Sequence, residues 1–139
     1  MTNTKPTIAV DAMGGDFGPV VVVPGAVAAA LDVGCNLVFT GDEKKIQTEL
    51  SKLAPRDASI RIVHTDEVAG MDEKPSDVLR KRKNTSIQVA CRLVREGEAQ
   101  GVVSAGNSGV TVACGMFGIG RIQGVDRPGL ASIMPTEKG

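Results

Sequence analysis

The segment whose residues could most readily do chemistry is Val-Val-Ser-Ala-Gly-Asn-Ser-Gly-Val, residues 102–110. Its glycines let the backbone approach a ligand closely, and N–H groups at the start of a following helix lack partners inside that helix. Such N–H groups and the helix dipole together attract an anion. The segment therefore predicts a phosphate site formed by Ser104, Gly106, Asn107, Ser108 and Gly109. The alternative is a tight Asn-Gly turn that binds nothing.

Two acidic residues enclose a second glycine-rich stretch, Asp11-Ala12-Met13-Gly14-Gly15-Asp16. Carboxylates repel phosphate, so they are better suited to pair with a Lys or Arg, to accept hydrogen bonds from hydroxyl or amide groups, or to bind a metal ion. The alternative is a glycine loop in which Asp16 caps the next turn.

The densest charge run is Arg80-Lys81-Arg82-Lys83. Cations at the end of a helix gain a modest stabilisation from the helix dipole, so the run is either a solvated last turn or a set of contacts for an anionic substrate or an acidic carrier protein. His64, the single histidine, lies near Asp66 and is either a general base or a structural residue. Neither a nucleotide-binding loop nor a serine-hydrolase elbow occurs in the sequence.

Strands and helices alternate along the chain. We expect strands at 7–10, 36–40, 59–64, 101–104 and 130–134, and helices from Val22 or Val23 to 33, 43–53, from Pro75 or Ser76 to 81, 86–96 and 110–119. Asp42 is expected to cap the second helix, and Thr85 with Gln88 has the spacing of a capping box. This alternation predicts an α/β fold, a mostly parallel sheet with helices on both faces. The carboxyl edge of such a sheet, where ligands bind, would carry both glycine-rich stretches.

Composition excludes several classes of protein. Sixteen basic and sixteen acidic residues balance, so no overall charge attracts nucleic acid or an anionic membrane. The three cysteines contain no Cys-x-x-Cys pair, which argues against a zinc site or a disulfide framework. The N-terminus lacks the features of a signal peptide, and a cytoplasmic protein is expected. Residues 99–120 are uncharged, but glycines interrupt them, so we expect a buried strand, a turn and a buried helix rather than a membrane span.

Four separated segments resemble the phosphate acyltransferases that depend on acyl carrier protein. They are residues 8–16, 80–86, 102–109 and 120–128. The resemblance implies transfer of a fatty acyl group from acyl carrier protein to inorganic phosphate, no cofactor or bound metal, a homodimer, and a fold similar to phosphotransacetylases and isopropylmalate dehydrogenases. Phe17 and Gly18 depart from the family's usual Asn and Ala. Because the family is more than twice this length, residues 1–139 are expected to be the N-terminal part of one catalytic region, with peripheral membrane contacts in the remaining part.

For that activity, the chemistry of the residues themselves suggests individual roles. Asn107 or a neighbouring N–H would stabilise the oxyanion, Lys83 and Arg82 would neutralise charge, and the 104–109 segment would hold phosphate and carbonyl. Asp11, Gly14, Gly15 and Asp16 would contact the acyl or pantetheine side of the substrate. Two other functions stay open: an acyltransferase acting on short acyl-coenzyme A, as in phosphotransacetylases, and a non-catalytic phosphate-binding module.

Overall fold

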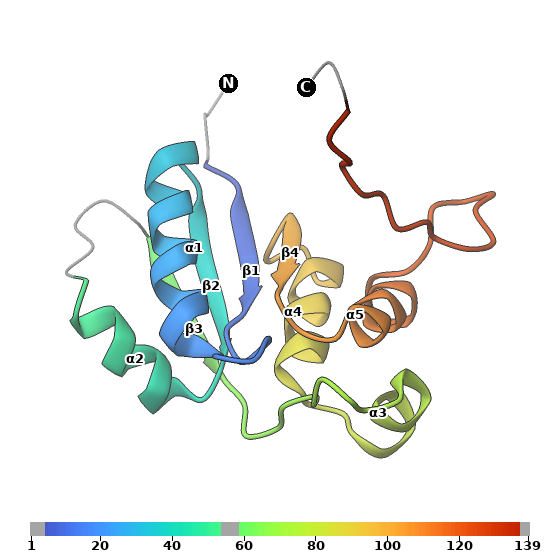
Figure 1. Ribbon diagram of the computed structural model, residues 1–139, viewed down its shortest axis with the longest axis horizontal. Coiled ribbons are helices and arrows are strands. Elements are labelled where there is room, and N and C mark those ends of the chain that lie inside the picture. The colour runs from blue at the N-terminus through green and yellow to red at the C-terminus, as the bar shows by residue number, and fades with distance from the viewer. Residues whose placement is uncertain (1–4, 54–58, 137–139) are drawn as a thin grey trace.

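The computed structural model describes residues 5–53 and 59–136. Its elements are β1 (Thr7–Asp11), α1 (Pro19–Val33), β2 (Asn36–Gly41), α2 (Glu43–Ser51), β3 (Ile60–His64), α3 (Pro75–Lys81), α4 (Ser86–Arg95), β4 (Gly101–Ser104), α5 (Ser108–Cys114) and a π-helical turn, η1 (Gly115–Ile119), that continues α5. The four strands form one parallel sheet in the order β3-β2-β1-β4 (Figure 1). The predicted α/β class and parallel sheet are confirmed.

The sheet is covered on both faces. Successive side chains of a strand point to opposite faces, so the alternating residues of β1 separate two clusters. Val10 packs with Val23 and Val27 of α1, whereas Ala9 packs with Ala90 and Leu93 of α4. Ile46 places α2 on the α1 face. Figure 1 shows α1 and α2 to one side of the strands and α4 to the other.

A third cluster joins α3, α4 and α5 to one another. Its buried members are Val78, Ile87, Cys91, Val110 and Cys114. Burial is the main cause that raises the pKa of the Cys91 thiol to about 12 and that of Cys114 to about 11. Both thiols are therefore protonated packing residues, and the cluster fixes the position of α5 against the rest of the fold.

Helix ends follow the predicted capping chemistry. Asp42 Oδ1 accepts a hydrogen bond from the N–H of Lys45 at 3.2 Å and caps α2. Thr85 Oγ1 accepts from the N–H of Gln88 at 3.4 Å, and Gln88 Oε1 accepts from the N–H of Thr85 at 3.1 Å. This reciprocal pair is the capping box expected for α4.

Several predicted boundaries were wrong by one to four residues, including the start of α5, which begins at Ser108 rather than at residue 110. α1 begins at Pro19, three or four residues before the expected start, because a proline at the first helical position loses no intrahelical hydrogen bond. α2 ends at Ser51 rather than at residue 53, where a tight turn lets the N–H of Leu53 donate to Leu50 O at 3.0 Å. β3 begins at Ile60, one residue later than expected.

The strand predicted at Leu130–Met134 is contradicted. These residues have no regular structure, since no described strand pairs with them. The side chain of Ile133 is fully exposed. The expected buried strand and helix of the uncharged segment are also wrong in part. Val103 of β4, which is an edge strand of the sheet, is 55% exposed, and Phe117 of η1 is 65% exposed. Among the described residues, no helix has the length and apolar character needed to cross a membrane.

Candidate functional site

The two glycine-rich stretches meet at the point where the strand order reverses. From β1 the chain builds outward through β2 to β3, and then returns to place β4 on the other side of β1. In open parallel sheets, ligands bind at the carboxyl ends of the strands beside such a reversal. The loop after β1 and the bend after β4 both begin there, with Asp11 directly opposite Ser104 in the register.

A hydrogen-bonded chain connects the two strand ends. Ser104 Oγ donates to Asp11 Oδ2 at 2.8 Å and accepts from the N–H of Gly106 at 3.1 Å. The other carboxylate oxygen of Asp11 accepts from the N–H of Met13 at 3.3 Å. Asp11 is only 3% exposed, so this buried carboxylate holds the bend and the β1 loop together.

Glycine is required where the two loops touch. A Cβ on Gly14 would lie 2.8 Å from the backbone nitrogen of Gly106 and 2.9 Å from Asp11 Oδ2. Gly15 has a φ of +83°, and a Cβ there would lie 3.2 Å from the carbonyl oxygen of Ala105. Any side chain at these positions would separate the loops, so both glycines serve the close approach of backbone to backbone.

Asn107 uses its whole side chain to fix the bend. Its Oδ1 accepts from the N–H of Val110 at 3.2 Å, which caps α5. Its Nδ2 donates to the carbonyl oxygens of Met71 at 2.6 Å and Glu73 at 3.0 Å. The structure therefore shows Asn107 as the link between the bend and the loop before α3.

The backbone of the bend remains open. No described residue accepts a hydrogen bond from the N–H groups of Asn107, Ser108 or Gly109. Ser108 and Gly109 are exposed, and Asn107 and Gly106 are half-buried, so the bend faces solvent. These N–H groups lie at the start of α5 and can donate hydrogen bonds to an anion that approaches from solvent.

The two cations assigned to the site have different surroundings. Arg82 is half-buried, and its guanidinium donates to the carbonyl oxygen of Val68 and, at 2.5 Å, to Glu73 Oε1. Lys83 is exposed and has no hydrogen bond or ion pair within residues 5–53 and 59–136. Lys83 is thus the cation of the pair whose charge is available to a ligand.

Asp16 and His64 take no part in the Asp11–Ser104 contact. Asp16 is exposed in the loop after β1, without an ion pair to any described residue. His64 ends β3, three strand spacings or about 14 Å from β4. Its Nδ1 accepts a hydrogen bond from the N–H of Glu43 at 3.2 Å, and its Nε2 lies 2.9 Å from Asp66 Oδ1.

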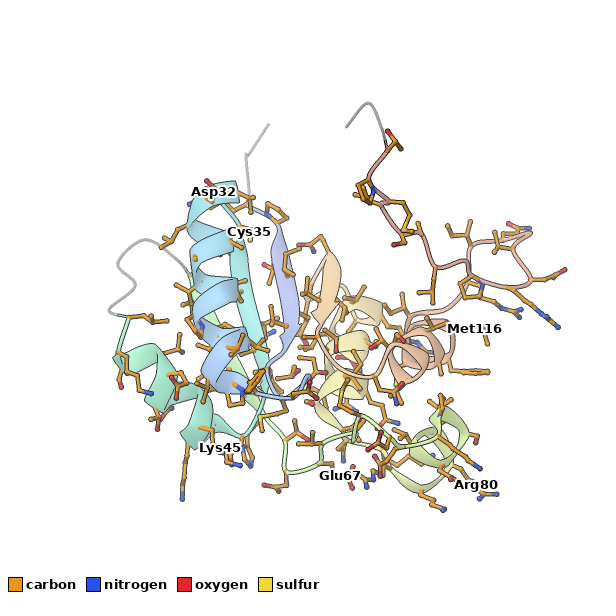
Figure 2. The ribbon with its side chains drawn as sticks, viewed as in Figure 1. Asp32, Cys35, Lys45, Glu67, Arg80 and Met116 are labelled. Carbon is orange, nitrogen blue, oxygen red and sulfur yellow. The ribbon has the colours of Figure 1, made fainter. Side chains whose placement is uncertain are left out.

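Figure 2 distinguishes the two edges of the sheet. Cys35, just before β2, marks the amino edge, whereas Glu67, just after β3, marks the carboxyl edge at the opposite end of the molecule. In the described part of the chain, no group of three His, Cys, Asp or Glu side chains is arranged to hold a metal ion.

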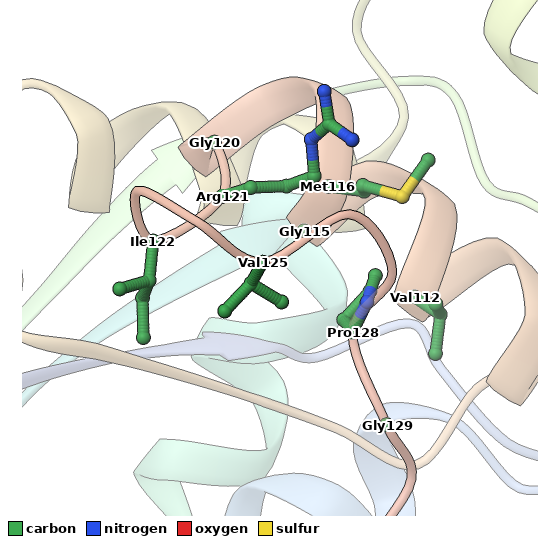
Figure 3. Close-up of a pocket in the computed structure, with 9 residues that line it drawn as sticks. All are labelled: Val112, Gly115, Met116, Gly120, Arg121, Ile122, Val125, Pro128 and Gly129. Atoms are coloured by element: carbon green, nitrogen blue, oxygen red, sulfur yellow. The ribbon is translucent and has the colours of Figure 1, made fainter.

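A hollow of about 430 Å³ lies on η1, between that turn and the 120–129 loop (Figure 3). Met116, Ile122, Val125 and Pro128 contribute its apolar side chains, while the guanidinium of Arg121 points away from them. The hydrogen bond from Arg121 Nη1 to the carbonyl oxygen of Asp126, at 2.7 Å, closes this loop. The resembling segment 120–128 therefore forms one wall of a cavity next to α5.

Sequence reasoning missed the loop before α3. Met71 and Glu73 hold Asn107 through their carbonyl oxygens, and the Glu73 side chain also binds Arg82. Backbone acceptors leave no signature in residue type. The one available signal is Glu73 itself, an acidic residue placed between Gly70 and the cation run.

This chain is similar to known proteins over nearly its whole length. The fatty acid synthesis protein family matches residues 6–139. A phosphate acyltransferase from Oleidesulfovibrio alaskensis is 62% identical over 138 residues, which are 99% of this chain and 40% of that protein. Phosphate acyltransferases from Nitratidesulfovibrio vulgaris (strain DP4) and Geobacter sulfurreducens are 62% and 50% identical, over 94% and 95% of this chain and 38% of each relative. The chain thus spans about 40% of the length of these relatives, and it belongs to the fatty acid synthesis protein family.

Proposed function

We propose that this chain forms the phosphate-holding part of an enzyme that transfers a fatty acyl group from acyl carrier protein to inorganic phosphate. The observation that carries the proposal is the open bend at Ser108 and Gly109, whose N–H groups have no described acceptor and lie at the strand-order reversal. The family and the names of the relatives support an acyl group as the second substrate.

In the proposed reaction, a phosphate oxygen attacks the thioester carbonyl carbon. The C–S bond then breaks, the thiolate of the carrier leaves and takes a proton from solvent, and acyl phosphate is released. Phosphate is already a nucleophile near neutral pH, so the reaction needs no covalent enzyme intermediate. Positioning of the two reactants can supply about 7–11 kcal/mol in favourable cases.

The N–H groups of the bend bind the phosphate and stabilise the carbonyl oxygen as it becomes an oxyanion. Removing one such donor raises the activation free energy by about 2.7–4 kcal/mol. Asn107 is assigned as a positioning residue, because its amide is occupied by Met71, Glu73 and Val110. Lys83 supplies positive charge toward phosphate, and Arg82 holds the loop before α3 through Glu73.

The β1 loop forms the opposite wall of the site. Asp11 and Gly14 orient the bend through Ser104 and Gly106, and the exposed Asp16 accepts hydrogen bonds from the amide groups of the pantetheine arm. The proposal includes three partners. Acyl carrier protein delivers the acyl group, a second copy of the chain forms a homodimer, and polypeptide outside residues 1–139 makes a peripheral membrane contact. The proposal also includes a fold similar to those of phosphotransacetylases and isopropylmalate dehydrogenases.

The test is acyl-phosphate formation by the complete gene product that contains this chain. Inorganic phosphate is supplied with long-chain acyl carrier protein in one reaction and with acetyl-coenzyme A in another. The proposal expects acyl phosphate to form faster, at equal concentrations, from the long-chain donor. A preference for acetyl-coenzyme A would instead indicate an enzyme that acts on short acyl groups. Phosphate binding without acyl phosphate from either donor would indicate a non-catalytic module.

A further inference from the structure

A groove of about 610 Å³ runs between α3 and the continuous helix formed by α5 and η1. α3 supplies Pro75, Ser76, Leu79 and Arg80, and the other wall carries Ala113 and Phe117. The volume falls within the roughly 300–1,000 Å³ typical of small-molecule sites. In Figure 1, α3 and α5 lie next to each other on the side of the molecule away from α1.

One end of this groove reaches the bend. A Cβ on Gly109 would lie 3.1 Å from Pro75 Cγ, so the first turn of α3 is in contact with the bend itself. Gly109, Ala113 and Phe117 are spaced four residues apart and share one face of the helix. At 1.5 Å per residue, the eight steps from Gly109 to Phe117 make a path of about 12 Å that leads away from the phosphate site.

The lining suits a hydrocarbon chain. Pro75, Leu79, Ala113 and Phe117 present apolar atoms, and the Phe117 side chain is 65% exposed within the groove. Arg80 is the charged residue of the lining. Its Nη2 lies 3.3 Å from Asp77 Oδ1, and its side chain extends outward from α3 in Figure 2. Ser76 and Arg80 are the lining residues whose side chains can form hydrogen bonds, and the apolar remainder of the groove can remove methylene groups from water.

We propose that this groove, which we call the α3–α5 groove, holds the acyl chain of the substrate while the thioester carbonyl lies at the bend. The inference rests on the proposed function and adds the place where the chain binds. Continuity with the bend selects this occupant, because Pro75 lines the groove and also lies against Gly109 of the bend. Each methylene that enters the groove should raise kcat/KM about fourfold until the groove is full.

The test fills the α3–α5 groove at a position one helical turn beyond Gly109. Ala113→Phe is introduced into the complete gene product, with Ala29→Phe as the matched control, because Ala29 is exposed on α1 at the opposite face of the sheet. Acyl-phosphate formation is measured with acyl carrier protein charged with a C16 or a C4 chain. We expect Ala113→Phe to lower kcat/KM for C16 at least 10-fold and to leave C4 within about twofold, while Ala29→Phe changes neither.

Equal loss for both chain lengths, or no loss for either, would overturn the groove assignment while leaving the proposed function standing. Failure of the unsubstituted protein to form acyl phosphate from any donor would instead remove the proposed function. A second measurement does not depend on activity: a C16 fatty acid with a diazirine at its ω end is photo-crosslinked to the protein. Labelled peptides from α3 and α5 are expected. Labelling of peptides outside α3 and α5 contradicts the proposal. This result is expected if further polypeptide or a second copy of the chain covers the groove.

Discussion

Replacing Ser108 with proline would remove one N–H group from the bend and almost nothing else. Ser108 is the first residue of α5, the position where proline fits a helix best. The preceding residue, Asn107, has φ −56° and ψ 115°, close to the extended conformation that a following proline favours. The lost N–H has no acceptor among the described residues, so the folded state loses no internal hydrogen bond.

The expected cost to the reaction follows from the role of that N–H. If it donates to phosphate or to the developing oxyanion, removing it should lower acyl-phosphate formation about 10²–10³-fold, as for other oxyanion donors. Ser108 is exposed, so the stability of the fold should change by less than about 0.5 kcal/mol. The assay is the initial rate of acyl-phosphate release by the complete gene product at saturating phosphate, with thermal unfolding as the check on folding.

Ser108→Ala is the matched control, because it removes the hydroxyl and keeps the N–H. Its rate should stay within about threefold of the unsubstituted protein. A folded Ser108→Pro protein that is as active as Ser108→Ala would refute the assignment of this N–H to the reaction.

Three further predictions concern the packing around the site. Ser104→Ala leaves Asp11 Oδ2 without its donor and should lower the free energy of unfolding by about 1.5–3 kcal/mol in urea denaturation, with a neutral result counting against the Asp11–Ser104 link. Gly14→Ala should lower the free energy of unfolding by about 1–3 kcal/mol, because its Cβ would meet Gly106 and Asp11. Gly25→Ala in α1 should raise the free energy of unfolding by about 0.4–1 kcal/mol, because a Cβ there meets nothing within 4 Å. If urea denaturation shows both variants changing the stability in the same direction, the close approach at Gly14 is contradicted. Cys91 and Cys114 have pKa values raised to about 12 and 11, so both thiols should resist alkylation by iodoacetamide at pH 8 until urea unfolds the protein. Mass spectrometry measures the alkylation, and rapid alkylation of the folded protein would contradict the burial of these thiols. Because these pKa values exceed the ordinary thiol value of 9.0, the stability that the two thiols contribute is complete below pH 9 and is lost as the pH rises toward 11 and 12.

Four of the five predicted strands and all five predicted helices occur in the structure, because each of these elements has a local signal. Short apolar runs marked β1 to β4, and Asp42 and Thr85 marked helix starts through caps that depend on neighbours three residues away. The prediction failed where structure depends on a partner. The apolar stretch Leu130–Met134 looks like a strand, but a strand exists only when another chain segment accepts its hydrogen bonds, and residue types do not reveal that segment.

The site was predictable in outline for a similar reason. Glycine-rich turns after two strands implied loops at one sheet edge, and the structure brings both to the strand-order reversal. The direct role given to Asn107 stays a prediction of the sequence alone, since its amide is directed to Met71 and Glu73 by a tertiary contact of 34 to 36 residues' separation. No local pattern encodes such a contact.

The most direct test of the account is a phosphate titration of the ¹⁵N-labelled protein followed by amide NMR. The account predicts saturable shifts concentrated on the backbone N–H signals of Asn107, Ser108 and Gly109, with Gly14 shifting less because it contacts the bend without donating to the anion. If these three signals stay in place while phosphate shifts signals elsewhere, or shifts none, the bend does not bind phosphate.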